Sequence, residues 1–261
     1  MNNITFPFAF LLKELRRSNR WIPILILIPI VLALSLVSTL LVQHLPASLM
    51  EVIRRTIHLT SPTELATLGS YLTLYLFLFW LSSFQCFQIF LVPKEEQMLP
   101  FYLSKPMTRT GYVAVHLFSS LCTLTFFAVV TSMGSYGIIQ TWCGSVSLTH
   151  YLAGCAIVLS LTFFLLLVSN FIFLFMKDLY YALGISFLLW FLPLIPFQVY
   201  IYRPELFQDR LLLSKIVLFP ANLVWQDAQT QFLLPLFPPF LLLGCLVFFW
   251  KASNRIERMD L

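Results

Sequence analysis

The sequence predicts an all-α integral membrane protein with six transmembrane helices. Hydrophobic residues make up 59% of the 261 residues and charged residues only 10%, and the mean hydropathy is +0.87. Six stretches come close to or exceed the roughly 20 mainly apolar residues that a helix needs to cross a bilayer. They cover residues 21–43, 66–92, 112–140, 151–176, 179–202 and 232–250. We therefore expect a single transmembrane domain over residues 1–261.

The segment before the first span, residues 1–20, is amphipathic. It combines several Phe and Leu residues with the basic side chains of Lys13, Arg16 and Arg17. Such a helix lies in the membrane interface, with its basic side on anionic head groups. Two interpretations remain open: a positively charged anchor, or a stiff elbow that transmits force to the first span.

The first outer loop, residues 44–65, contains a short stretch, 49–57, that could be helical. The sequence Ser61-Pro62-Thr63-Glu64 then predicts the start of the second span. Ser61 would be the N-cap, Pro62 the first helical residue and Glu64 the third, which is the pattern of a capping box.

Residues 93–111 form the most informative polar segment. Pro93 ends the second span, because proline removes a backbone donor and clashes with the preceding turn. Acidic residues come first, apolar residues follow and basic residues close the loop, an order that suits the dipole of a short helix. Two interpretations remain open: a helix that docks in a partner's groove, or an interfacial helix that rests on lipid. The residues concerned are Glu95, Glu96, Leu99, Phe101, Leu103 and Arg109.

Three further connections follow. Residues 135–150 are predicted to be an uncharged outer loop with several glycines, and Lys177-Asp178 a tight inner hairpin. Residues 203–231 contain an apolar run that is too short to cross a bilayer. A re-entrant or interfacial outer helix fits this run better than a free loop, which would expose its apolar side chains to water.

The distribution of basic residues predicts the orientation. Eleven of the sixteen Lys and Arg residues lie on the side that carries both termini, and five lie on the other side. Because cytoplasmic loops are enriched in Lys and Arg, we expect both termini in the cytoplasm and a multi-pass protein of the inner membrane. The basic residues do not alternate with stacking aromatics outside the spans, so nucleic acid is not an expected partner.

Several kinds of chemistry have no support in the sequence. No charged residue lies deep within a span, which argues against an ion-coupled carrier. His116, near the inner end of the third span, fits an interfacial or hydrogen-bonded residue better than a ligand. The five cysteines form no CxxC pair and fit small packing residues. HExxH, GxSxG and GxxxxGK[ST] are absent, and we find no polar cluster facing one cavity. We expect no enzyme activity, metal or cofactor in this chain.

The layout resembles the permease subunits of ABC-2 type, or type V, ABC exporters. The resemblance is carried by the basic N-terminal sequence LLKELR at 11–16, the loop EEQMLPFYLSKPMTR at 95–109, the short turn FLFMKD at 173–178, and LFPAN at 218–222 before the last span. In that family, a glutamate-led stretch after the second span forms the coupling helix.

The resemblance implies a membrane-spanning permease that moves an amphipathic or lipid-like cargo. It implies a separate soluble ABC ATPase, which would hold ATP and Mg, and a second six-span permease, identical or related. The elbow would include Lys13, Arg16 and Arg17, and the coupling segment would include Glu95, Glu96, Leu99, Phe101, Leu103 and Arg109. Leu213, Phe219 and Pro220 would belong to an outer gate over the cargo path. The alternative is a non-transporting membrane anchor or a regulatory subunit.

Overall fold

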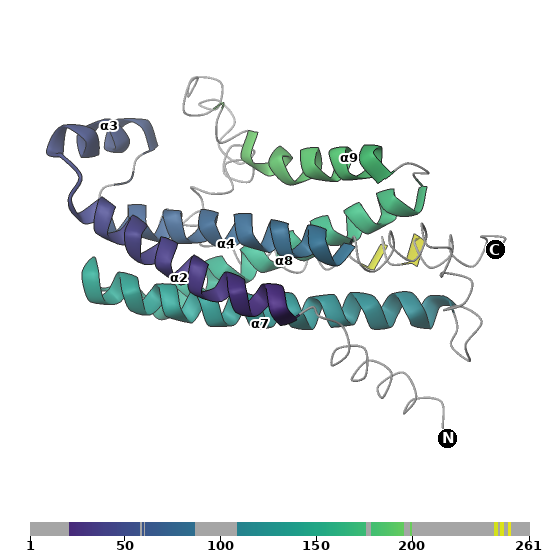
Figure 1. Cartoon of the computed structure of the whole chain (residues 1–261). Helices are drawn as coiled ribbons and strands as arrows, with labels where there is room; N and C mark the ends of the chain where they lie inside the picture. Colours follow the sequence, from purple (N-terminus) through teal and green to yellow (C-terminus); the bar gives the residue numbers. More distant parts are fainter. Residues whose placement is uncertain are drawn as a thin grey trace.

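The computed structural model describes a helical protein, and every element in its described part is a helix (Figure 1). The described residues are 21–57, 59, 61–86, 109–175, 179–195, 199, 243–244, 246–247 and 250–251. The elements are α2 (Trp21–Gln43), α3 (Ala47–Ile57), α4 (Pro62–Cys86), α7 (Arg109–Trp142), α8 (Leu148–Phe175) and α9 (Leu179–Phe191), followed by a 3-10 turn (Leu192–Leu194).

The four long helices form an antiparallel bundle. α2 packs against α4 and α7, α4 also packs against α7 and α8, and α9 packs against α8. α2 and α7 run toward the α3 end of the bundle, and α4 and α8 run away from it (Figure 1). α7 extends beyond the start of α2, because Trp21 contacts Phe126 near the middle of α7. The direction of the chain therefore alternates from each long helix to the next.

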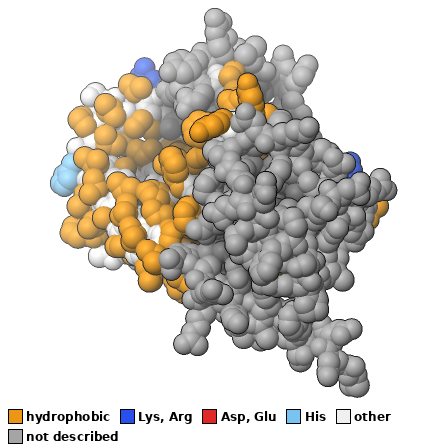
Figure 2. Space-filling view, turned by 45° about the vertical axis from the view of Figure 1, so that its right-hand side comes forward, with side chains coloured by type: hydrophobic (Ala, Val, Ile, Leu, Met, Phe, Trp, Pro, Cys, Tyr) orange, Lys and Arg blue, Asp and Glu red, His pale blue; other side chains and the backbone are white. Residues whose placement is uncertain are grey.

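The described residues on the face shown in Figure 2 present mainly apolar side chains. α2, the least buried of the four long helices, exposes Leu25, Ile26, Val37 and Leu41. Water would not favour such a surface, whereas lipid chains would. α2, α4, α7 and α8 are each long and apolar enough to cross a membrane. The chain thus has the architecture of an integral membrane protein.

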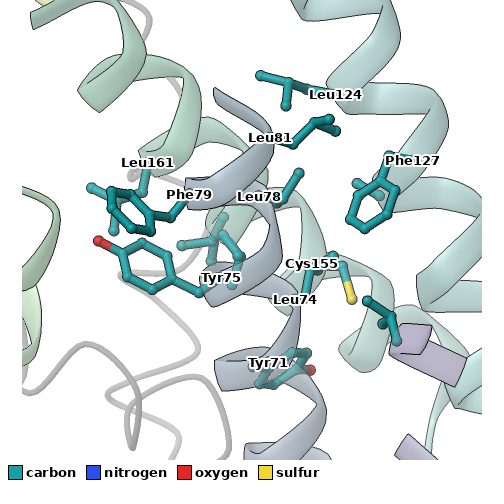
Figure 3. Packing of buried hydrophobic residues seen from close by; sticks show 14 of the residues in the cluster. Tyr71, Leu74, Tyr75, Leu78, Phe79, Leu81, Leu124, Phe127, Cys155 and Leu161 are labelled. Carbon is teal, nitrogen blue, oxygen red and sulfur yellow. The ribbon is translucent and has the colours of Figure 1, made fainter. Parts of the chain in front are cut away.

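The core lies where α4, α7 and α8 meet (Figure 3). Leu74, Leu78 and Leu81 of α4 are buried, and so are Leu124 and Phe127 of α7. These residues recur every three or four positions, which places them on one face of each helix. This interdigitated layer fixes α4 against α7 in the middle of the bundle.

Four of the six predicted spans are confirmed as helices that could cross a membrane: 21–43, 66–92 as α4, 112–140 as α7 and 151–176 as α8. The fifth prediction, 179–202, coincides with α9, the 3-10 turn and helical residues Ile195 and Val199. In the sixth, the described residues between 243 and 250 are helical. Gly244 packs against α8, where an added Cβ would lie 2.7 Å from Phe164 Cε2.

Two local predictions in the first outer loop are confirmed. The predicted helix 49–57 is α3, whose Ile53 packs on the core while Arg55 donates to Glu51 at 3.0 Å. The capping box is also present. The backbone N–H of Glu64 donates to Ser61 Oγ at 3.2 Å, and the N–H of Ser61 donates to Glu64 Oε2 at 3.2 Å.

The predicted loop at 135–150 is wrong. α7 continues to Trp142, α8 begins at Leu148, and only residues 143–147 are non-helical. Gly137 does not end the helix, and just before it Gly134 leaves room for the side chain of Leu32 of α2. Burial of Ser135 and Ile139 then holds the last turns of α7 in the bundle, and Gly144, at φ 115°, makes the turn.

Candidate functional site

Most of the residues that the sequence singles out lie outside the described residues. This holds for Lys13, Arg16 and Arg17 of the elbow, for Glu95, Glu96, Leu99, Phe101 and Leu103 of the coupling segment, and for Leu213, Phe219 and Pro220 of the outer gate. Arg109 is described as the first residue of α7. The functional argument therefore rests on the interior of the bundle.

The polar residues buried in the described part are all formally uncharged: hydroxyls, two amides and the imidazole of His116. This agrees with the prediction that no charged residue lies deep within a span. Many of the hydroxyls are satisfied locally. Thr39, Thr131 and Thr162 each donate to the carbonyl four residues earlier, at 2.7 to 2.8 Å. Such bonds remove the cost of burying a hydroxyl without linking one helix to another.

A group of aromatic residues links α4, α7 and α8 near their α3 end. Tyr71 and Tyr151 are stacked with their ring centroids 5.4 Å apart, and Tyr71 donates to the Tyr151 carbonyl oxygen at 3.2 Å. Ser70 Oγ and Tyr151 Oη share a hydrogen bond of 2.5 Å. Tyr136 of α7 contacts the ring of Tyr151 and donates to the Val146 carbonyl oxygen. The hydroxyls of these three tyrosines are therefore satisfied, although His150 Nε2 and Ser132 Oγ are buried without a hydrogen-bond partner within the structure.

The opposite end of the α4–α7 contact is different. Gln85 Nε2 of α4 donates to Thr123 Oγ1 of α7 at 2.5 Å. Gln85 Oε1, Ser82 Oγ and Ser120 Oγ are buried and have no hydrogen-bond partner within the structure. We call these four residues, Ser82, Gln85, Ser120 and Thr123, the Gln85 cluster.

A second incompletely bonded region lies on α8 and α9. Trp190 Nε1 donates to Ser169 Oγ at 3.3 Å, and Tyr75 Oη donates to the Trp190 carbonyl oxygen. Next to Ser169, both amide atoms of the buried Asn170 have no partner, and the same is true of Ser186 Oγ. The bundle is thus better satisfied at its aromatic cluster than at Asn170 or the Gln85 cluster.

A polar cavity of about 180 Å³ lies between the start of α4 and the turn before α8. Thr63 Oγ1 donates to the Cys143 carbonyl oxygen at 2.8 Å across this region, and burial raises the pKa of the Cys143 thiol. No group of three His, Cys, Asp or Glu residues that could hold a metal exists among the described residues. Hydrogen-bonding groups nevertheless dominate the lining, which consists of Ser61, Thr63, Glu64, Thr67, Ser145, Val146, Ser147 and His150.

The sequence analysis missed the Gln85 cluster, since it found no polar residues that would face one cavity. A signal was present: Ser82 and Gln85 are three residues apart, as are Ser120 and Thr123, in otherwise apolar spans. That spacing places each pair on one helix face. What could not be read from it was that the two faces meet.

Neither the known family models, nor the curated proteins, nor the solved structures include a significant match to this chain.

Proposed function

We propose that this chain is the membrane-spanning permease subunit of an ABC transporter, and that it moves an amphipathic or lipid-like cargo. A separate soluble ATPase would supply the energy, and a second six-span permease, identical or related, would complete the path. Spans five and six, the inner-membrane location and the cytoplasmic termini are parts of this proposal.

The observation that carries the proposal is the direction of the helices. α2 and α7 run in the same direction, toward the α3 end of the bundle (Figure 1), and α2 begins beside the middle of α7, where Trp21 contacts the ring of Phe126. The sequence resemblance assigns the elbow to residues before Trp21 and the coupling segment to residues before Arg109. An ATPase on the side opposite α3 would face the chain segments that lead into these two core helices, and movement of the segment before Trp21 would act on the α2–α7 contact, which begins at Trp21 and Phe126.

The composition of the described interior supports an amphipathic or lipid-like cargo. Intramembrane charges normally accompany ion and proton paths. The described interior instead combines large apolar side chains with neutral hydroxyl and amide groups. Such groups can hydrogen-bond a neutral polar part of an amphipathic molecule while the apolar side chains accommodate its hydrocarbon.

The test is the partnership. The chain should be purified with mild detergent from its native membranes, and a co-purifying subunit with a GxxxxGK[ST] sequence is expected. Phe101→Ala and Leu103→Ala should then release this ATPase or uncouple its hydrolysis from transport, because central buried residues dominate binding at interfaces. Lys94→Gln is the matched control, since it lies just outside the named coupling residues and a charge at the rim of an interface contributes little.

Other results would contradict the proposed partnership with an ATPase. If no ATPase co-purifies, or if both variants assemble and transport like the wild type, residues 93–111 merely rest on lipid. A different co-purifying enzyme, in the absence of an ATPase, would favour the alternative of a membrane anchor or regulatory subunit.

A further inference from the structure

The contact between α4 and α7 changes character along its length. In its middle, Leu78 and Leu81 of α4 approach Leu124 and Phe127 of α7, and all four are at most 1% exposed (Figure 3). Toward the end that carries Cys86 and Arg109, hydroxyl and amide groups replace the apolar residues. Because α4 and α7 run in opposite directions, Ser120 and Ser82 lie on opposite sides of the Gln85–Thr123 hydrogen bond. Ser120 lies closer to the N-terminus of α7, and Ser82 lies closer to the apolar middle of the contact.

Burial of the Gln85 cluster costs free energy in the structure. Its four residues are each 0% exposed, yet three of them contain an oxygen without a hydrogen-bond partner within the structure. A buried polar group left without a partner typically costs about 1–3 kcal/mol. Native proteins normally satisfy such groups with protein atoms or with ordered water. These oxygens therefore need a bonding partner from outside the described chain.

We propose that the Gln85 cluster is a binding site for a small uncharged hydrogen-bonding group, and that this group enters when α4 and α7 separate at their Cys86–Arg109 end. Gln85 Oε1 can accept a hydrogen bond, and the hydroxyls of Ser82 and Ser120 can both donate and accept one. A water molecule meets these needs, and so does a hydroxyl or amide of a cargo; the second source rests on the function proposed above.

The described surroundings favour an uncharged ligand. No Asp, Glu, Lys or Arg side chain is buried among the described residues, so a bound ion would find no buried counter-charge among them. Burying an isolated charge costs far more than burying a neutral polar group. The imidazole of His116 lies on α7 one turn before Ser120, and His116 already makes an interaction of its own.

The apolar middle sets the inner limit of this site. Opening at the level of Ser120 or Gln85 replaces missing hydrogen bonds with new ones to water. Opening at Leu78 or Phe127 exposes only hydrocarbon, at about 25 cal/mol per Å². Access is therefore expected to fall from Ser120 to Ser82 and to stop beyond Ser82.

Cysteine labelling tests the site directly. In a variant without Cys86, Cys122, Cys143, Cys155 and Cys245, single cysteines replace Ser82 or Ser120, and Ser70 or Ala128 as buried controls. Ser70 is a matched serine whose hydroxyl is bonded to Tyr151. A small neutral reagent, iodoacetamide, should label positions 82 and 120 about tenfold faster than the controls, a difference of about 1.4 kcal/mol in opening free energy. Anionic iodoacetate should lose this preference, beyond its intrinsic difference in thiol reactivity.

Further measurements distinguish a bound water molecule from a bound cargo hydroxyl and check the labelling result independently. Protection of positions 82 and 120 by a neutral glycoside amphiphile would identify a cargo hydroxyl as the bound group, and labelling without protection would identify water. On the unmodified chain, amide hydrogen exchange should be faster at 82–86 and 116–120 than at 71–78. Labelling at 82 and 120 no faster than at Ala128, together with uniform slow exchange, would overturn the site. Neither measurement involves an ATPase, so the proposed function can fail while this site stands.

Discussion

Replacing Gly154 of α8 with alanine should separate α8 from α4 at the aromatic cluster. A Cβ at Gly154 would overlap Cζ and Oη of Tyr71 and would lie 2.9 Å from its Cε1. The Tyr71 ring cannot easily move away, because it stacks on Tyr151 and donates to the Tyr151 carbonyl oxygen. The added methyl group must therefore displace a rigid, fully buried ring.

The magnitude follows from three contributions. Overpacking of a well-packed core costs about 1–3 kcal/mol. Loss of the Tyr71 hydrogen bond adds about 1 kcal/mol. The better helix propensity of alanine returns about 1 kcal/mol. The variant should thus be less stable by about 1–3 kcal/mol, with the spread set by the overpacking contribution.

The assay is the apparent melting midpoint of the purified protein in detergent, followed by size-exclusion chromatography after heating. Gly69→Ala in α4 is the matched control, since an added Cβ there meets nothing within 4 Å. Tyr71→Phe should lower the midpoint by less than Gly154→Ala, because it removes the hydrogen bond without adding volume. If Gly154→Ala melts at or above the temperature of Gly69→Ala, the tight contact between Gly154 and Tyr71 is refuted.

Three other predictions follow. In cells, an impermeant thiol reagent should label a cysteine at Arg210 but not one at Lys105, and the reverse would invert the orientation. Ser61→Ala should lower the melting midpoint, since the capping bond to the Glu64 N–H is worth about 1 kcal/mol; Ser61→Asp, which can still cap, should not. Leu213→Asp should impair assembly or transport by placing an unpaired charge in a re-entrant helix, and wild-type behaviour would favour a free loop.

The elements that the sequence predicted well depend on local signals. The four long spans follow from apolar runs that are as long as a membrane-spanning helix requires. The start of α4 follows from Ser61, Pro62 and Glu64, whose roles are fixed by positions only three residues apart. Such features can be read from the chain because the interacting groups are neighbours in sequence.

The end of α7 could not be read in this way. The sequence supported two overlapping interpretations here, a span at 112–140 and an outer loop at 135–150 that contains Gly137 and Gly144, and propensity alone favours the loop. The deciding contacts come from distant residues, because Leu32 of α2 occupies the space that Gly134 leaves. Tertiary packing outweighed the weak local preference, which is at most about 1 kcal/mol for each glycine.

The Gln85 cluster shows why the interior chemistry was harder still to predict. Thr131 and Ser120 are both buried hydroxyl residues on α7. Thr131 donates to its own helix, whereas Ser120 Oγ has no partner within the structure. The sequence does not show which of the two hydroxyls bonds within its own helix. A span without charged residues can therefore still contain a binding site, formed by neutral groups whose hydrogen bonds the closed bundle leaves incomplete. Such a site would discriminate against ions by desolvation and accept neutral polar groups, as the path of the proposed amphipathic cargo would require.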